Sequence, residues 1–245
     1  MSPTFHGHPT VPTLLDLADA PVREENCESV LQRLAEAAAL LPGVESAACF
    51  LTDAEGTITH GAASDGIALQ LNSVQADLTE GPGLDSCRTA KPLANVSMDH
   101  PHTRTRWPRF ASHAAGVGVT AVTAVPMRYL DRNLGALNLY HRHRAQSTVD
   151  ARAGRLLADA AAIGLSHRAL LDDLRSRERQ LRVALESRVI IEQAKGLLAE
   201  RLNCTVDDAF DLLRHHARSH QVILADVARA VVHDPTEGPF PARRS

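Results

Sequence analysis

The stretch from Ser187 to Arg201 reads SRVIIEQAKGLLAER, and its apolar side chains recur at spacings of three and four residues. This spacing is typical of a helix that buries one face. Gly196 interrupts the run, and a glycine inside a helix costs about 1 kcal/mol relative to alanine. Its position therefore indicates close approach by another backbone or by a ligand, and the alternative is a tolerated glycine on the surface.

Two further helices are predicted after this stretch. Thr205 precedes the run VDDAFDLLRHHARSH and has the side chain of a typical N-cap residue. A third, shorter apolar run extends from Val222 to Val232 and is followed by Pro235. Three helices of this size, each with one apolar face, predict a small helical bundle.

The three predicted helices carry the sequences RVIIEQAKGLLAER from Arg188, TVDDAFDLLR from Thr205 and LADVARAVV from Leu224. In this order they closely resemble the ANTAR domain, the RNA-binding module of bacterial transcription antitermination regulators. The resemblance implies binding to nascent mRNA at paired stem-loops with six-nucleotide loops, so that a terminator hairpin cannot form.

The resemblance also implies which residues contact RNA. The first helix of the bundle presents basic and polar side chains around Gly196, with Ala194 small enough to permit close approach. Thr205 can cap its helix and can also offer its hydroxyl group to a phosphate. The predicted RNA-binding residues are Arg188, Gln193, Ala194, Lys195, Gly196, Arg201, Thr205 and Arg214.

Two of these arginines have alternative roles. At about 100° per residue, Arg201 lies roughly 120° around the helix from the other basic side chains. It either reaches a phosphate from the side or pairs with Glu200 or Asp208. Arg214, like Arg218 on the same helix, either adds positive potential to the surface or is solvated or paired with Asp211.

The charge balance argues against general electrostatic attraction to nucleic acid. The formal net charge of the chain is -3 at pH 7, and basic and acidic residues balance between Ser187 and His233. A neutral module is expected to recognise a shaped RNA loop with modest affinity. Phe210, the only aromatic residue of this module, is assigned to the core, which favours hydrogen bonds to loop bases over base stacking.

The first half of the chain is predicted to be an α+β domain. Its pattern indicates a helix, a hairpin, a helix, a Gly/Pro loop, an irregular segment and a second hairpin with a turn at 131–133. That order is typical of an antiparallel sheet with flanking helices. The predicted ranges are a helix at 27–41, strands at 44–52 and 57–63, a helix at 64–78, and strands at 119–127 and 134–141.

A second resemblance covers this half. The sequences EGPGLDSC at Glu80, RWPRF at Arg106 and LGALNLY at Leu134 resemble those of GAF domains in actinobacterial regulators. The resemblance implies a sensor domain with a six-stranded antiparallel sheet and a small-molecule pocket on one face. The irregular segment between about Pro92 and Gly116 is expected to form the roof of this pocket. Neither the ligand nor any cofactor can be identified from the resemblance.

The candidate pocket residues lie in the predicted roof, where aromatic and imidazole groups can close over a ligand. They are Asp99, His102, Trp107, Phe110 and His113. Alternatively, the histidines are solvated and the rings of RWPRF anchor the roof to the core. A metal site would need three or four converging ligands, so we predict none.

A long helix is predicted between the two domains, because no proline occurs from Val149 to Leu202. Several leucines in it fit one heptad frame, as in a parallel coiled-coil dimer whose register a sensor can alter. The alternative is a helix packed back on its own GAF domain. The leucines in this frame are Leu157, Leu171, Leu174, Leu181 and Leu185.

Taken together, the patterns predict an α+β GAF domain joined by a coiled-coil-like helix to an all-α three-helix ANTAR bundle. The predicted divisions are a flexible arm at 1–25, in which Leu14, Leu15 and Leu17 can dock a short helix, the GAF domain at 26–166, a helical linker at 167–186, the ANTAR domain at 187–235 and a disordered tail at 236–245. The expected protein is a homodimer whose GAF domain senses a ligand or partner and controls RNA binding.

The four cysteines form no CxxC pair, and no leader or membrane-spanning run is apparent, so we expect a cytoplasmic protein with reduced thiols. Two other function classes stay open. A methionine sulfoxide reductase of GAF fold would bring Cys49 and Cys87 together. A DNA-binding helix-turn-helix would use a basic recognition helix at 223–233. No catalytic signature is found, and we expect a protein that is not an enzyme.

Overall fold

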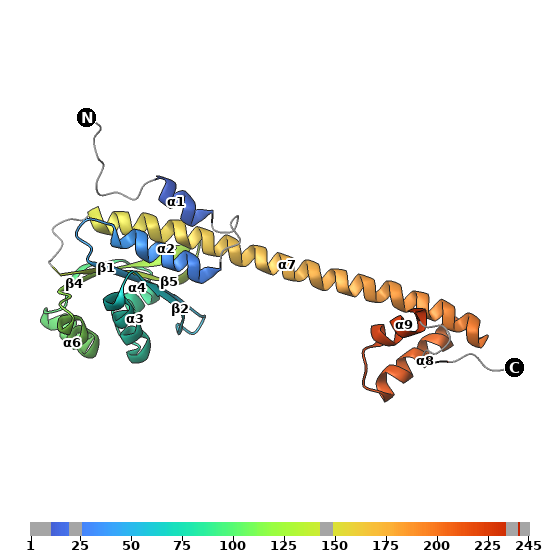
Figure 1. Cartoon of the computed structure of the whole chain (residues 1–245). Coiled ribbons are helices and arrows are strands. Elements are labelled where there is room, and N and C mark those ends of the chain that lie inside the picture. The colour runs from blue at the N-terminus through green and yellow to red at the C-terminus, as the bar shows by residue number, and fades with distance from the viewer. Residues whose placement is uncertain (1–10, 20–25, 143–148, 234–239, 241–245) are drawn as a thin grey trace. The chain divides into compact units, whose positions relative to one another are not determined.

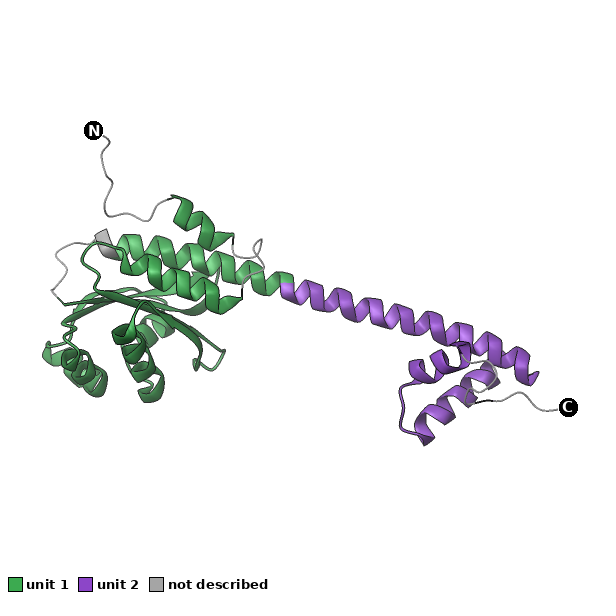
Figure 2. Cartoon of the chain, viewed as in Figure 1, with its two compact units in different colours: residues 1–171 green, residues 172–245 purple. Residues whose placement is uncertain are grey.

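The computed structural model describes residues 11–19, 26–142, 149–233 and Phe240. Figure 1 shows the helices and strands of the chain. The chain divides into two compact units, residues 1–171 and 172–245, which are coloured separately in Figure 2. Helix α7, Val149–Leu202, contributes residues to both units.

The first unit is built on a five-stranded antiparallel sheet with strand order β2-β1-β5-β4-β3. The α+β prediction is therefore confirmed, but the described residues form five strands and not the six that the resemblance implied. The close pairing of β1 with β5 requires Gly135, because a Cβ atom there would lie 1.8 Å from the carbonyl oxygen of Phe50. The strands are β1 (Ser46–Thr52), β2 (Ile58–Ala63), β3 (Leu93–Ser97), β4 (Ala121–Tyr129) and β5 (Arg132–His141).

One face of the sheet is covered by α2 (Cys27–Ala39) and by the first part of α7 (Figure 1). Leu157, which was assigned to the coiled-coil seam, is fully buried in this core. The alternative of a helix packed on its own sensor domain is thus correct for this part of α7, because the sheet face needs an apolar cover.

The predicted arm contains the short docked helix that its leucines indicated. Residues Val11–Ala18 form helix α1, whose Leu17 is buried in the same core. Gly164 permits this contact, since a Cβ atom there would lie 2.2 Å from the carbonyl oxygen of Leu17. Residues 1–10 and 20–25 of the predicted arm lie outside the described residues.

The other face of the sheet carries α3 (Gly66–Leu78), α4 (Pro82–Thr89), α5 (Pro101–Arg106) and α6 (Pro108–Gly116). The roof segment was predicted to be irregular, but it contains β3, α5 and α6. Pro101 and Pro108 each stand at the start of a helix. Proline is well suited to that position because its missing N–H would have no intrahelical partner there, so these prolines begin helices instead of breaking them.

The turn of the second hairpin also differs from the prediction. Strand β5 begins at Arg132, so the turn lies at Leu130 and Asp131, one residue earlier than expected. Leu130 has a φ of 52°, in the left-handed region that favours glycine. A leucine gives no sequence signal for such a turn.

The second unit contains the three-helix bundle predicted from the sequence. The last part of α7 packs against α8 (Val206–Ser219) and α9 (Leu224–His233) through a core that includes Ala194, Leu198, Leu213 and Val231. In the same unit, Leu174, Leu181 and Leu185 stay 52%, 71% and 66% exposed on α7. Of the predicted tail, only Phe240 lies within the described residues.

No helix among the described residues is long and apolar enough to cross a lipid bilayer.

Candidate nucleic-acid interface

Two cations and one aromatic ring meet where the end of α7 packs against α8. The ammonium nitrogen of Lys195 lies 5.2 Å from the ring centroid of Phe210, and the guanidinium carbon of Arg214 lies 5.5 Å from the same centroid. Cation–π contacts at such sites contribute about 0.5–1 kcal/mol each. Phe210 is half-buried and stands outside the apolar core of the bundle, which corrects its assignment as a core residue.

Each cation of this cluster also has an acidic neighbour. The Lys195 Nζ atom lies 2.9 Å from a carboxylate oxygen of Glu192, and Arg214 lies 3.8 Å from Asp211. The Arg214–Asp211 pair is exposed on both sides, and exposed ion pairs contribute only about 0–1 kcal/mol. A phosphate group can therefore replace Asp211 at small cost, while Lys195 is more buried beneath its exposed partner Glu192.

Gly196 lies beside Lys195 on the exposed side of α7. A Cβ atom added at Gly196 would meet no heavy atom of the described chain within 4 Å. Close approach by another part of this described chain is therefore not the reason for the glycine. Arg188, two turns earlier, is exposed as well. Gln193 is exposed too, and at about 100° per residue it lies roughly 60° around the helix from Gly196, on the side away from Lys195.

Ala194 does not belong to this surface. Its side chain is fully buried in the bundle core against α8 and α9, so the prediction that it contacts RNA is corrected. A small residue at this position allows the helices to pack closely.

Thr205 also has a structural role. Its hydroxyl oxygen accepts the N–H of Asp208 at 3.1 Å, and the Asp208 carboxylate accepts the Thr205 hydroxyl at 2.6 Å. This capping box leaves Asp207 and Asp208 in the first turn of α8. The predicted cap is therefore confirmed, whereas the phosphate contact of Thr205 stays a prediction that these two carboxylates disfavour.

Arg201 takes neither of the two predicted partners. Its guanidinium group donates to the carbonyl oxygen of Phe240 at 3.2 Å. The Phe240 ring packs edge-on against His216 with 5.2 Å between ring centroids. Arg201 is therefore bonded to Phe240, beyond the end of α9, and is not part of the cluster of Lys195, Phe210 and Arg214.

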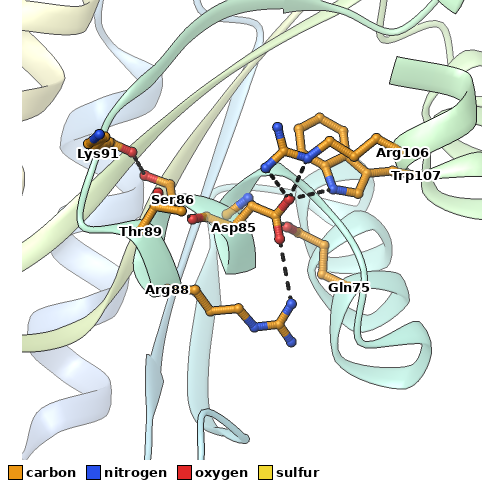
Figure 3. Close-up of polar contacts among 9 residues, drawn as sticks. Gln75, Asp85, Ser86, Arg88, Thr89, Lys91, Arg106 and Trp107 are labelled. Carbon is orange, nitrogen blue, oxygen red and sulfur yellow. Dashed lines mark hydrogen bonds and ion pairs between the residues drawn. The ribbon is translucent and has the colours of Figure 1, made fainter. Parts of the chain in front are cut away.

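In the first unit, two carboxylates from the EGPGLD sequence hold the α5–α6 segment. Figure 3 shows the Asp85 carboxylate between Arg106, Trp107 and Arg88. It accepts Nε–H of Arg106 at 2.7 Å and the indole N–H of Trp107 at 3.0 Å. Glu80 accepts the backbone N–H groups of Arg109 and Phe110 at 2.8 and 2.6 Å, at the start of α6. Glu80 and Asp85 thus fix the α5–α6 segment, the predicted roof, to the start of α4.

The predicted ligand pocket is not assembled by its five residues. Trp107 and Phe110 are buried in the apolar core, as the anchoring alternative proposed. Asp99, His102 and His113 are exposed, and His113 bonds through Nδ1 to the carbonyl oxygen of Arg109. No group of three metal-ligating side chains converges among the residues that the structure describes.

Sequence reasoning missed a group of buried polar side chains on the sheet face below α3 and α4. Gln75 on α3 and Asn138 on β5 are fully buried. The Gln75 amide oxygen accepts the N–H of Gly83 at 2.9 Å. Within the described residues, neither amide atom of Asn138 has a hydrogen-bond partner. Single polar residues in a strand or helix pattern give no signal for such a group.

The family model of the GAF domain matches residues 24–166 of the sequence, and the family model of the ANTAR domain matches residues 179–232. The chain belongs to the GAF–ANTAR family. GAF domains are sensory modules and ANTAR domains are RNA-binding modules of antitermination, so this GAF–ANTAR protein is a regulator that combines signal transduction with RNA binding. Domains of these two kinds are typically not catalytic.

Solved structures similar to this GAF–ANTAR protein match its first unit. The phycocyanobilin-bound GAF domain of a cyanobacterial phytochrome is 13% identical with a TM-score of 0.46, over 65% of this chain and 94% of that chain. The GAF domain of a phosphoenolpyruvate-protein phosphotransferase from Coxiella burnetii is 16% identical with a TM-score of 0.46, over 66% and 98% of the two chains. No curated protein matches the chain.

The cysteine positions in the GAF–ANTAR protein contradict the reductase alternative. Cys49 packs against α2 and donates to the carbonyl oxygen of Leu31, whereas Cys87 packs with Phe50 on the opposite face of the sheet. Burial raises the pKa of both thiols, so neither is an activated thiolate at neutral pH. Two thiols separated by the sheet cannot form a disulfide.

The DNA-binding alternative is also unsupported in the GAF–ANTAR protein. Helix α9 would be the recognition helix, but its one arginine, Arg229, is paired with Asp226 on the same helix. A recognition helix needs several side chains that reach base edges and phosphates. The basic side chains of the bundle gather instead on α7 and α8.

Gly196→Ala in the GAF–ANTAR protein separates the two explanations of this glycine. The added methyl group meets nothing in the described chain, so the free energy of unfolding should rise by up to about 1 kcal/mol. If RNA lies against this surface, affinity should fall about tenfold, or about 1.4 kcal/mol. Urea unfolding and fluorescence anisotropy with a hexaloop hairpin measure the two effects. Gly116→Ala, at an equally open position on α6, is the matched control and should leave RNA affinity unchanged.

Asp85→Ala tests the clamp on the α5–α6 segment. The substitution leaves the indole N–H of Trp107 without its acceptor, and Trp107 is only 3% exposed. An unsatisfied donor of this kind costs about 1–3 kcal/mol, so the free energy of unfolding should fall by that amount in urea titrations. Asp99→Ala, which removes an exposed carboxylate from the same face, should change it by less than about 0.5 kcal/mol.

Proposed function

We propose that this protein is a cytoplasmic antitermination factor that binds paired hairpins with six-nucleotide loops in nascent mRNA. A signal on the GAF domain changes a dimer equilibrium through α7, and two ANTAR bundles then bind two adjacent loops. The bound RNA is unable to form a terminator hairpin. The single observation that carries the proposal is the cluster of Lys195, Phe210 and Arg214 beside the open backbone of Gly196.

This cluster favours a loop over a duplex for reasons of charge and shape. Each of its cations has an exposed acidic neighbour, so the surface is not a broad positive field that would hold any phosphate backbone. Unpaired loop nucleotides expose base edges and phosphates that can approach Gly196 closely. The half-buried Phe210 also offers an aromatic ring close to both cations, which adds a contact that the sequence did not predict.

The exposed leucines of the second unit support a homodimer. Leu174, Leu181 and Leu185 lie on one side of α7 because their spacings are seven and four residues. A row of this kind on a helix is the usual seam of a two-stranded coiled coil. A dimer carries two ANTAR surfaces, and the binding of the second loop becomes intramolecular.

A small-molecule signal has a candidate position in the GAF domain. Asn138 presents a buried amide group without a partner among the described residues, and the buried Gln75 amide, which accepts the N–H of Gly83, is close to it. These amides can donate and accept hydrogen bonds and carry no charge. They support sensing of an uncharged ligand at this place better than the exposed Asp99, His102 and His113 do.

Binding of an RNA with two hexaloops, compared with an RNA carrying one, tests the proposal. Bivalent binding should raise the affinity for the two-loop RNA by about 10² or more over the single-loop control. Lys195→Ala and Arg188→Ala should lower the affinity for both RNAs. Equal affinity for both RNAs, unchanged by either substitution, would remove the proposal.

A further inference from the structure

A groove with a volume of about 300 Å³ lies between α8 and the turn that leads into α9. It is lined by Arg214, Ala217, Arg218, Val222 and Leu224. The groove therefore combines three apolar side chains with two guanidinium groups. Arg214 also stands over the Phe210 ring, so the groove adjoins the cluster of Lys195, Phe210 and Arg214.

The two arginines are available to a ligand. Arg214 and Arg218 are four residues apart on α8, so they point to the same side of the helix. Arg214 has Asp211 as its ion-pair partner at 3.8 Å, beyond hydrogen-bond distance. Within the described residues, Arg218 has no ion-pair partner, and its side chain is exposed.

The apolar lining is open at Val222. Val222 is 46% exposed, although Ala217 and Leu224 beside it pack into the bundle core. A planar, uncharged group that needs little hydration fits such a lining, and an adjacent anion fits the guanidinium groups, which bind phosphate in a bidentate manner. A nucleotide has both parts, because its base is planar and its phosphate is anionic.

We propose that this groove receives one unstacked base of the RNA loop and that Arg218 binds the phosphate next to it. The inference rests on the proposed function and extends it, because it places a base-binding site between α8 and the turn into α9, beside the predicted RNA-binding residue Arg214. Arg214 joins the two parts, since it lines the groove and contacts Phe210.

The test combines a filled groove with loops that lack single bases. Val222→Trp should fill the groove, and each position of the hexaloop is replaced in turn by an abasic nucleotide. With the unmodified protein, one abasic position should lower hairpin affinity about tenfold, since stacking and pocket contacts contribute about 1–3 kcal/mol per base. With Val222→Trp, the intact hairpin should bind about tenfold more weakly, and the same abasic position should cause no further loss.

Ile223→Trp is the matched control. Ile223 is the neighbouring residue, is 69% exposed and does not line the groove, so its substitution should leave the abasic pattern unchanged. Arg218→Gln provides a second variant at an exposed position. It should lower hairpin affinity and reduce the slope of log affinity against log salt by about 1, as expected for one lost phosphate contact. Circular dichroism and melting confirm folding of each variant.

Three results overturn the inference, and they differ from failure of the proposed function. If Val222→Trp binds every RNA as the unmodified protein does, no base occupies the groove, while hairpin binding through Lys195 stands. If Val222→Trp and each abasic position lower the affinity independently of one another, the groove likewise holds no base. If Val222→Trp instead converts the dimer to a monomer, the groove holds a second copy of the chain. Failure of the unmodified protein to bind any hairpin would reject the proposed function itself.

Discussion

Lys195→Ala should weaken binding of a hexaloop hairpin by about 10- to 100-fold, because a charge-assisted hydrogen bond contributes about 1.5–3 kcal/mol. The side chain of Lys195 is only 15% exposed and is held over Phe210 and beside Glu192. It is therefore preorganised and loses little conformational entropy when it binds a phosphate. Alanine also leaves Glu192 as an unneutralised carboxylate on the RNA surface. Fluorescence anisotropy at fixed salt measures the loss.

Lys91→Ala is the matched control for this prediction. Lys91 is the only other lysine of the chain, and it is exposed in the GAF domain. The two substitutions remove the same charge, so general electrostatic attraction predicts equal losses. A loss confined to Lys195→Ala assigns RNA binding to the ANTAR surface, whereas equal losses would argue against a specific site there.

Leu181→Glu should convert the dimer to a monomer and remove the preference for RNA with two loops. Leu181 is 71% exposed, and it lies in the centre of the row with Leu174 and Leu185. A carboxylate at a coiled-coil seam position would meet its own copy across the two-fold axis, where like charges repel and cannot be desolvated. Native mass spectrometry reads the mass of the assembly, and affinity for the two-loop RNA should fall about 10²-fold to that of the single-loop RNA.

Val183→Glu is the control on the same helix. Val183 is 60% exposed but stands two residues from Leu181, roughly 200° around α7 at about 100° per residue. The substitution introduces the same charge outside the leucine row, so the dimer mass and the two-loop preference should persist. Dissociation by both substitutions, or by neither, would contradict the assigned seam.

Sequence patterns predicted a feature correctly where the residues that form the contact are near neighbours in the sequence. Thr205 caps α8 because its hydroxyl and the carboxylate three residues later satisfy each other, and that pairing is visible in the sequence. The 3.6-residue period likewise located the bundle core around Leu198 and Leu213. Both features depend on residues that are near neighbours on one helix.

The site was less predictable because its members come from different helices. Phe210 reads as an apolar core position on α8, and only the packing of α7 against α8 places it beneath Lys195. Ala194 reads as a small residue of the binding face, but it lies roughly 200° around the helix from Gly196, inside the core. In the GAF domain, Gln75 on α3 and Asn138 on β5 are far apart in the sequence, and each lies beside Gly83.

The most direct measurement compares one stem closed either by a six-nucleotide loop or by a four-nucleotide loop, with the unmodified protein and Lys195→Ala. We predict that the unmodified protein binds the six-nucleotide loop about tenfold or more tightly, and that Lys195→Ala binds both RNAs with the same low affinity. Equal affinity of the unmodified protein for the two loops would contradict recognition of a loop by this surface.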